Sequence, residues 1–321
     1  MSGWAARVRA PEEGDPYPDA LTRPDLAGTA ATEAVTVVAE RDADEISYLL
    51  VLRTLATGGL LARTPDYGGP LASRGAPAHA ADPAVRSAID ELLQDRGVVS
   101  EVFALGPLLP ERNAVAAAWG AQEAKRVCIT DLLDLDVLRS GLSKGRRSDL
   151  ARATRECRFE FRPFDVAVAD EFGARYAEAM DRLDAADRWR LDAGWFRGVA
   201  GRPGLWLSSA TSDTGGAAGI FAVTAARASY HLAARWGQAP GASTAVLWNA
   251  FERLAALGVE VVNLGGGVTD GVDDPLLRFK ASLATRTVPL LLGGRCFDPA
   301  GHQRAECAGD ARPLPAGYVV P

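Results

Sequence analysis

The chain has 321 residues, 48% hydrophobic and 24% charged, which is typical of a globular protein long enough for two domains. Its formal net charge is −6, so the molecule as a whole does not bind polyanions and any nucleic-acid contact must come from a local basic patch. Four scattered cysteines, three histidines and no long apolar run argue against a disulfide framework, a metal site, a signal peptide or membrane insertion, so we expect a cytoplasmic protein.

The first half of the chain is predicted to alternate short strands with one clear helix. Residues 1–33 are rich in Pro, Ala, Asp and Glu, a composition that packs poorly, so we expect a flexible N-terminal segment. Val85, Ile89 and Leu93 recur at helical spacing before Gly97, which predicts a helix that ends at this glycine. Together the patterns predict strands at 34–40, 46–55, 98–109 and 127–133, a helix at 82–97 and a loop at 64–75.

The second half is predicted to be richer in helix. Its best helical pattern spans residues 241–258 and has a glycine at either end. The other patterns predict helices at 138–157 and 168–186, and strands at 158–165, 204–213, 215–236 (two strands with a turn near Ala226), 259–266 and 286–297. Residues 298–321 are rich in Pro, Gly and Ala and are expected to form a C-terminal tail.

The order of these elements predicts the domain organisation. Strand, helix, several strands, helix and strand occur twice with variations, which indicates an α/β (α+β) protein with two domains of similar plan. Each domain is expected to have a mixed central sheet flanked by helices. We place the first domain at residues 34–150 and the second at 151–297.

A lysine follows closely on a glycine-rich strand end. The segment VVNLGGG places Gly265 and Gly266 where bare backbone can approach a ligand. Lys280 comes directly after Phe279 in RFKASLA, and an ammonium group there could hold an anion or stabilise charge on a carbonyl oxygen. An ordinary surface lysine is the alternative. The residues between carry Asp270, Asp273 and Asp274, a residue type that forms turns and caps helices.

A second candidate anion site precedes the helix predicted at 241–258. The segment QAPGAS partly matches the Q/R-x-x-G-x-G/A loop with which acyl-CoA acetyltransferases hold a pyrophosphate, and Gln238 and Gly241 occupy two of its positions. A helix N-terminus suits an anion because its first N–H groups have no partner within the helix. The same residues fit equally well a glycine that simply begins a core helix.

One stretch is strongly basic in this acidic chain. Residues 139–162 carry an excess of cations over Asp149, Glu156 and Glu160. The cations are Arg139, Lys144, Arg146, Arg147, Arg152, Arg155, Arg158 and Arg162. Such an excess suits the phosphates of a nucleic acid or a nucleotide, although a charged helix face is also commonly just solvated.

Aromatic residues beside glycine or arginine mark two further candidates. Tyr67 lies in TPDYGGP, where a phenol on a glycine-rich loop faces either a ligand or a simple turn. Arg182 and Trp189 lie in AMDRLDAADRWR, and the arginine fork suits a carboxylate or a phosphate. Motifs of nucleophilic or zinc-dependent hydrolysis, such as GxSxG and HExxH, are missing. An enzyme made of these parts would position two substrates and stabilise an oxyanion.

Several segments in their order resemble the FemABX-like transferases, which are double-GNAT proteins. The segments are TPDYGGP, LSKGRRSDLARATRE, YAEAMDRLDAADRW, YHLAARW, PGASTAVLWNAFERLAALGVEVVNLGGG and DPLLRFKASLA, and the resemblance covers residues 34–295. It implies two tandem GNAT-like domains. It also implies transfer of an amino acid from aminoacyl-tRNA to an amine with formation of an amide bond. Aminoacyl-tRNA would be a co-substrate, and no bound cofactor is expected.

The resemblance also implies roles for individual residues. Lys280, in the Phe-Lys pair, would lie at the reacting ester and act in catalysis, and Arg182 would contact an acidic acceptor. The other substrate-binding residues would be Tyr67, Trp189, Tyr230, Arg235, Gly265, Gly266 and Phe279. The residues that contact tRNA or phosphate would be Lys144, Arg146, Arg147, Gln238 and Gly241.

The acceptor and two competing functions stay open at this point. The acceptor would be an amine-bearing small molecule or peptide, either a cell-wall precursor or an intermediate of natural-product synthesis. Met180 stands where the family usually has a threonine, which favours a specialised small-molecule acceptor. The first alternative is a GNAT N-acyltransferase that uses acetyl-CoA or another acyl-CoA. The second is a binding or scaffold protein that has lost catalysis. No sequence pattern indicates an oligomeric state.

Overall fold

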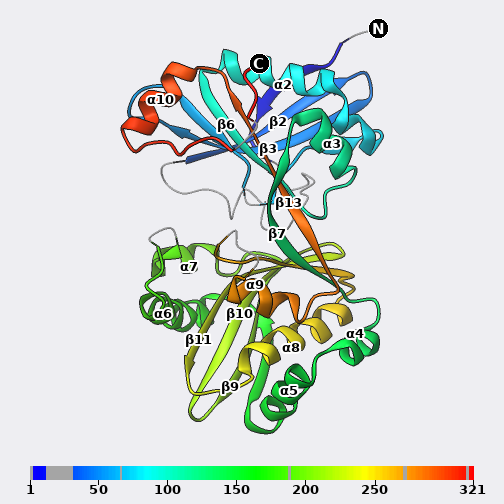
Figure 1. The fold of residues 1–321 in the computed structure, drawn as a ribbon, viewed down its shortest axis with the longest axis vertical. Helices are drawn as coiled ribbons and strands as arrows, with labels where there is room; N and C mark the ends of the chain where they lie inside the picture. The colour runs from blue at the N-terminus through cyan, green and yellow to red at the C-terminus, as the bar shows by residue number, and fades with distance from the viewer. Residues whose placement is uncertain (1–2, 12–31, 66, 187–188, 270–272, 316–317) are drawn as a thin grey trace. The chain divides into compact units, whose positions relative to one another are not determined.

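The computed structural model describes residues 3–11, 32–65, 67–186, 189–269, 273–315 and 318–321. The chain divides into two compact units (Figure 1). Unit 1 consists of residues 1–126 and 289–321, and unit 2 consists of residues 127–288. The chain passes between the units inside two strands, β7 (Gln122–Asp131) and β13 (Arg286–Cys296).

Unit 1 is a mixed sheet with helices packed on it (Figure 1). Its strands lie in the order β1-β2-β3-β4-β6-β13, with β5 paired to β3. The pair β4–β6 is parallel and the other pairs are antiparallel. The elements are β1 (Ala5–Arg9), β2 (Thr32–Arg41), β3 (Asp44–Thr54), β4 (Leu60–Arg63), β5 (Leu71–Arg74), the 3₁₀ helix η2 (Pro77–Ala81), α2 (Pro83–Asp95), β6 (Val98–Leu105), α3 (Arg112–Trp119) and α10 (Pro299–Cys307).

Unit 2 repeats this plan with its own mixed sheet. Its strands lie in the order β7-β12-β11-β10-β9-β8, and the pair β11–β12 is parallel while the others are antiparallel. The elements are α4 (Leu135–Gly141), α5 (Lys144–Glu156), β8 (Arg158–Pro163), α6 (Val166–Arg182), α7 (Ala193–Val199), β9 (Leu205–Ser212), β10 (Gly215–Thr224), β11 (Arg227–Gly237), α8 (Ala242–Ala256), β12 (Val261–Gly266) and α9 (Pro275–Ala281). The prediction of two domains of similar plan, each a mixed sheet flanked by helices, is confirmed.

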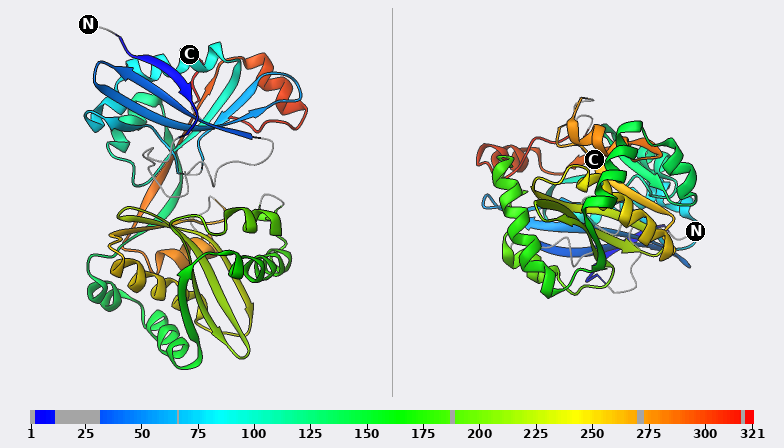
Figure 2. Two further views of the ribbon diagram at one scale, coloured as in Figure 1. Left: turned by 180° about the vertical axis from the view of Figure 1, so that it is seen from behind. Right: turned by 90° about the horizontal axis from the view of Figure 1, so that it is seen from below.

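The buried faces of the helices explain why these sheets are covered. In unit 1, Val85, Ile89 and Leu93 of α2 are fully buried, as their helical spacing predicts. In unit 2, α8 is buried on most sides, and it packs with α5 and the sheet in one apolar cluster. Helices α6 and α7 contact each other, and α6 also lies against β11 (Figures 1 and 2).

The predicted domain boundaries at residues 150/151 and 297/298 differ from those of the structure. Residue 150 lies inside helix α5, and residues 289–297 belong to unit 1. The reason is strand pairing: Leu291–Cys296 of β13 pair antiparallel with Ser100–Leu105 of β6. Unit 1 is therefore built from two separate stretches of chain, which a reading in chain order cannot show.

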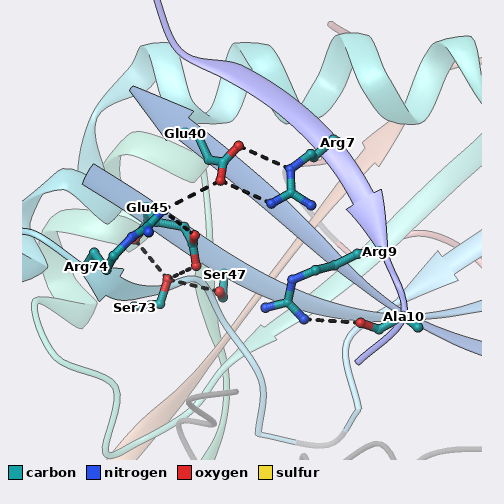
Figure 3. Close-up of polar contacts among 8 residues, drawn as sticks. All are labelled: Arg7, Arg9, Ala10, Glu40, Glu45, Ser47, Ser73 and Arg74. Atoms are coloured by element: carbon teal, nitrogen blue, oxygen red, sulfur yellow. Dashed lines mark hydrogen bonds and ion pairs between the residues drawn. The ribbon is translucent and has the colours of Figure 1, made fainter. Parts of the chain in front are cut away.

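Both predicted terminal segments contain regular structure. Within residues 1–33, β1 pairs with β2, and Arg7 forms a bidentate ion pair with Glu40 whose N–O distances are both 3.1 Å (Figure 3). Residues 12–31 lie outside the described part of the chain. Within residues 298–321, helix α10 is capped by Asp298 and packs Ala305 against Val99.

Two internal predictions also need correction. The single helix expected at 138–157 is two helices, because Ser143 caps α5 by accepting the N–H of Arg146 and the chain is extended at Leu142. The loop expected at 64–75 contains strand β5, which pairs with β3. Helices α3, α7 and α9 were not predicted, and each has at most eight residues.

Candidate active site

The candidate site of unit 2 begins where the two parallel strands stop pairing. Only Arg227–Ser229 of β11 pair with Val261–Asn263 of β12. Beyond this point β11 has a β-bulge, since Ile220 pairs with Leu232 and Phe221 with Tyr230, so His231 has no opposite residue in the ladder. A bulge bends a strand and redirects its side chains, and bulges are common beside active sites.

Tyr230 is the first residue of β11 after the parallel ladder. Its ring lies over Gly219 of β10, where a Cβ would be 2.6 Å from the tyrosine ring. The Phe221 ring packs against it with the centroids 5.2 Å apart. Burial raises the pKa of Tyr230, so the phenol stays protonated at neutral pH and is not a general base.

Strand β12 ends in a turn that only glycines fit. Gly265 is buried with φ of +73°, and the Asn263 side-chain oxygen accepts its N–H at 2.9 Å. At Gly267 a Cβ would lie 2.4 Å from the Asp274 carboxylate. The backbone just after β12 therefore lies close to Asp274, the N-cap residue of α9.

Lys280 lies on α9 with only 9% of its surface exposed. Its ammonium Nζ donates to the backbone carbonyl of Gly266 at 2.8 Å. The same nitrogen is 5.7 Å from the centroid of the Tyr230 ring, within the range of a cation–π contact. The structure therefore brings together Lys280, Gly266 and Tyr230, three of the predicted site residues.

Asp274 caps α9, the helix that carries Lys280. Its carboxylate accepts the N–H groups of Val268, Thr269 and Leu277 and the hydroxyl of Thr269, at 2.8–3.1 Å. Burial by itself raises the pKa of Asp274, but the hydrogen bonds from Thr269, Leu277 and Val268 together outweigh this effect. The net result is a pKa lowered from 3.8 to about 2. The expected cap role of Asp274 is confirmed, while Asp270 lies outside the described residues.

We expect this carboxylate to stabilise unit 2 above pH 4 and to lose its effect as the pH falls towards 2. Its pKa in the folded protein lies below the usual 3.8, so protonation favours the unfolded chain, by about 2 kcal/mol in full. Denaturation of the wild type and of Asp274→Asn between pH 2 and 7 measures this difference. The two unfolding free energies should converge in acid, and a gap that stays constant with pH would contradict the assignment.

Arg146 points inward from α5. Its Nε donates to the hydroxyl of Ser282 and its Nη1 to the hydroxyl of Thr244 and the carboxylate of Asp149, all at 2.9 Å. The guanidinium carbon also lies 5.0 Å from the centroid of the Phe279 ring. The side chain of Arg146, which was predicted to bind tRNA, is thus hydrogen-bonded to groups of this chain and lies next to Phe279.

The outer face of α5 is basic. Lys144, Arg147, Arg152 and Arg155 are exposed, and Arg158 follows the helix. The printed partners of Arg147 and Arg155 are backbone carbonyls, and none of the ion pairs between described residues involves these five side chains. Their positive charge is therefore not neutralised by a carboxylate contact.

The N-terminus of α8, the second predicted anion site, is covered by α5. Gly241 has φ of +83°, and a Cβ there would lie 2.5 Å from the carbonyl oxygen of Asp149. The Asp149 carboxylate lies 3.5 Å from the hydroxyl of Thr244 in the first turn of α8. Gln238 is exposed, and its N–H donates to the Thr214 carbonyl. The glycine is therefore required by helix packing.

The remaining predicted residues lie elsewhere. Arg182, at the end of α6, donates to the backbone carbonyl of Arg235 on β11, and both side chains are exposed. Trp189 is also exposed, and its carbonyl accepts the hydroxyl of Tyr176. Tyr67 belongs to unit 1, where its carbonyl packs against Gly106.

Several residues of the site were not singled out from the sequence. Asn263, Thr244 and Ser282 hold the glycine turn and Arg146, but no motif in the sequence singles out these three polar residues. The available signal was burial, because a polar side chain inside a core needs a partner. Among the described residues, no group of three or more His, Cys, Asp or Glu side chains could hold a metal ion.

Sequence comparisons find no relative. No protein-family model matches the chain, and no curated protein matches it significantly. No helix within the described ranges is both long and apolar enough to cross a membrane.

Solved structures match over most of the chain. The crystal structure of FemX aligns with a TM-score of 0.69 and 11% identity, covering 91% of this chain and 96% of FemX. The C-terminal domain of a putative lysylphosphatidylglycerol synthetase from Agrobacterium fabrum aligns with a TM-score of 0.52 and 17% identity, covering 76% and 79%. L-PGS from Bacillus licheniformis aligns with a TM-score of 0.51 and 14% identity, covering 78% and 80%. The chain therefore has a FemX-like fold, as expected from the resemblance of its sequence to the double-GNAT transferases.

Proposed function

We propose that this protein is an aminoacyltransferase that moves an amino acid from aminoacyl-tRNA to an amine of a small molecule or peptide in the cytoplasm. The observation that carries the proposal is the buried ammonium of Lys280, held on the Gly266 carbonyl beside the Tyr230 ring. A cation fixed in a partly water-excluded place interacts strongly with negative charge that develops nearby.

The reaction needs no nucleophile from the protein. The acceptor amine attacks the carbonyl carbon of the aminoacyl ester and forms a C–N bond. Negative charge then develops on the carbonyl oxygen, and Lys280 stabilises it. When the carbonyl re-forms, the C–O bond of the ester breaks, and the proton lost by the amine ends on the 3′-terminal ribose of the tRNA. Tyr230, whose pKa is raised by burial, keeps its proton throughout.

The packing of the helix N-termini favours aminoacyl-tRNA over acyl-CoA as the donor. A CoA pyrophosphate would need the first turn of α8 to be open, yet Asp149 approaches both Gly241 and Thr244 there. In unit 1 the N-terminus of α2 is capped by the Asp82 carboxylate, which accepts the Ala84 N–H at 2.9 Å. Groups of the chain itself, Asp149 with its ion-paired Arg146 and Asp82 with Arg41, therefore occupy the two helix ends that a CoA pyrophosphate would need.

The outer face of α5 supplies the charge that a tRNA requires. Its unpaired cations follow one another along a helix, whereas the chain as a whole has a net charge of −6. Binding of these side chains to phosphates releases counterions, so tRNA affinity should fall with salt.

We expect the triple variant Arg147→Ala, Arg152→Ala and Arg155→Ala to bind aminoacyl-tRNA at least about tenfold more weakly than the wild type. Each lost phosphate contact should lower the slope of log affinity against log salt by about 0.7–0.9. Filter binding of a charged tRNA pool at a series of salt concentrations measures both quantities.

The matched control removes the same charge from three other positions of unit 2, two of them exposed and one half-buried. It is the triple variant Arg197→Ala, Arg202→Ala and Arg253→Ala. The control should keep the affinity and the salt slope of the wild type. Equal losses in the two variants would mean that only net charge matters, and an unchanged α5 variant would remove α5 as the binding surface.

A further inference from the structure

Arg146 contacts two residues that flank Lys280 in the sequence. Its guanidinium lies against the ring of Phe279, the residue before the lysine, and its Nε donates to Ser282, two residues after it. Helix α9 has only seven residues, and so short a helix is not stable by itself. Its position must therefore come from such contacts, with Asp274 acting at its N-terminus and Arg146 near its C-terminus.

The other side of the same guanidinium is fixed to two further helices. Nη1 donates to Thr244 of α8, which is 1% exposed, and to Asp149, one turn along α5. The planar fork of an arginine sets the directions of these bonds, and a lysine could not reproduce them. Arg146 thus joins α5, α8 and α9 through one rigid group.

We infer that Arg146 is a positioning residue that aligns Lys280 with the aminoacyl-tRNA held on α5, whereas its neighbour Arg147 binds the tRNA itself. This inference rests on the proposed function. Arg146 points inward to α9, while Arg147 is exposed on the face of α5 that carries the unpaired cations. Loss of Arg146 should then slow the chemical step, and loss of Arg147 should weaken tRNA binding.

The test compares Arg146→Lys with Arg147→Gln in steady-state transfer of radiolabelled amino acid from tRNA to a panel of amines. Arg146→Lys keeps the positive charge but loses the fork, so kcat should fall about tenfold to a hundredfold, the range expected for a catalytic group displaced by about 1 Å. Its KM for aminoacyl-tRNA and its filter-binding affinity should stay within about twofold of the wild type. Arg147→Gln should instead raise the KM for aminoacyl-tRNA and leave kcat unchanged.

A second variant keeps the test decisive if Arg146→Lys does not fold. Ser282→Ala removes the hydroxyl that accepts from Arg146 and donates to the Phe279 carbonyl within α9, and it should lower kcat severalfold without changing KM. A wild-type protein that transfers no amino acid overturns the proposed function itself. A wild type that transfers, with kcat unchanged in Arg146→Lys or in Ser282→Ala, or with the loss falling on KM, overturns the positioning role alone.

Discussion

Replacing Lys280 by methionine is expected to lower kcat by about a hundredfold to a thousandfold, which corresponds to about 3–4 kcal/mol of lost transition-state stabilisation. Methionine has nearly the length of lysine but no charge, so the side-chain volume beside Tyr230 is largely kept. The buried position of the ammonium and its bond to Gly266 suggest that the charge is held in place before the substrate arrives. Pre-placed charge of this kind acts without reorganisation during the reaction.

Lys144, an exposed lysine at the start of α5, provides the control for this prediction. Lys144→Met removes the same charge, and its effect should fall on KM for aminoacyl-tRNA. Both variants are compared in the transfer assay after their thermal stability has been measured. A Lys280→Met protein that folds normally and keeps the kcat of the wild type would show that this lysine is a structural residue and takes no part in catalysis.

The largest expected effect on stability lies in unit 1. Glu101 is fully buried on β6, where it accepts the hydroxyl of Tyr48 and Nη2 of Arg86, both at 2.7 Å. Glu101→Gln keeps the shape of the side chain but leaves the buried Arg86 with less compensating charge. We expect a loss of about 3–5 kcal/mol in the unfolding free energy, the cost of breaking a buried ion pair from one side. Burial and the Glu101 charge both raise the pKa of Tyr48, so it should ionise more readily in the variant.

The ion pair of Arg7 and Glu40 in the same unit lies on the surface and serves as a comparison for the buried pair of Glu101 and Arg86 (Figure 3). Their side chains are 52% and 35% exposed, and exposed pairs contribute only about 0–1 kcal/mol. Glu40→Gln should therefore barely change the midpoint of chemical denaturation. Similar losses in Glu40→Gln and Glu101→Gln would contradict the view that burial sets the size of the effect.

The sequence predicts the longer strands and the helices α2, α6 and α8 of this protein, because their signals are local. The spacing of Val85, Ile89 and Leu93 predicts α2, and the glycines at both ends of 241–258 mark α8 within a few residues. Pairing between distant segments has no such signal. The return of β13 to β6, which assigns residues 289–297 to unit 1, depends on a contact across almost 200 residues of chain.

The sequence predicts the neighbourhood of Lys280 in part, but not the contacts that hold it there. Glycine beside a strand end and lysine after phenylalanine do come together as Gly266, Phe279 and Lys280. The two arginines at 146 and 147 look alike in the sequence, since a run of charges does not tell which side chain faces inward. Their separation depends on how α5 is turned against α8, which is set by tertiary packing of Leu150 and Ala153.

Filter binding with a competitor distinguishes the proposed donor, aminoacyl-tRNA, from acetyl-CoA. The purified protein is incubated with a pool of charged tRNA at two salt concentrations, with and without acetyl-CoA. We expect salt-sensitive retention of charged tRNA that acetyl-CoA does not reduce, and the retained amino acid then identifies the donor. No retention of tRNA, together with a rise in melting temperature on addition of acetyl-CoA, would rule out aminoacyl-tRNA as the donor and identify an acyl-CoA enzyme.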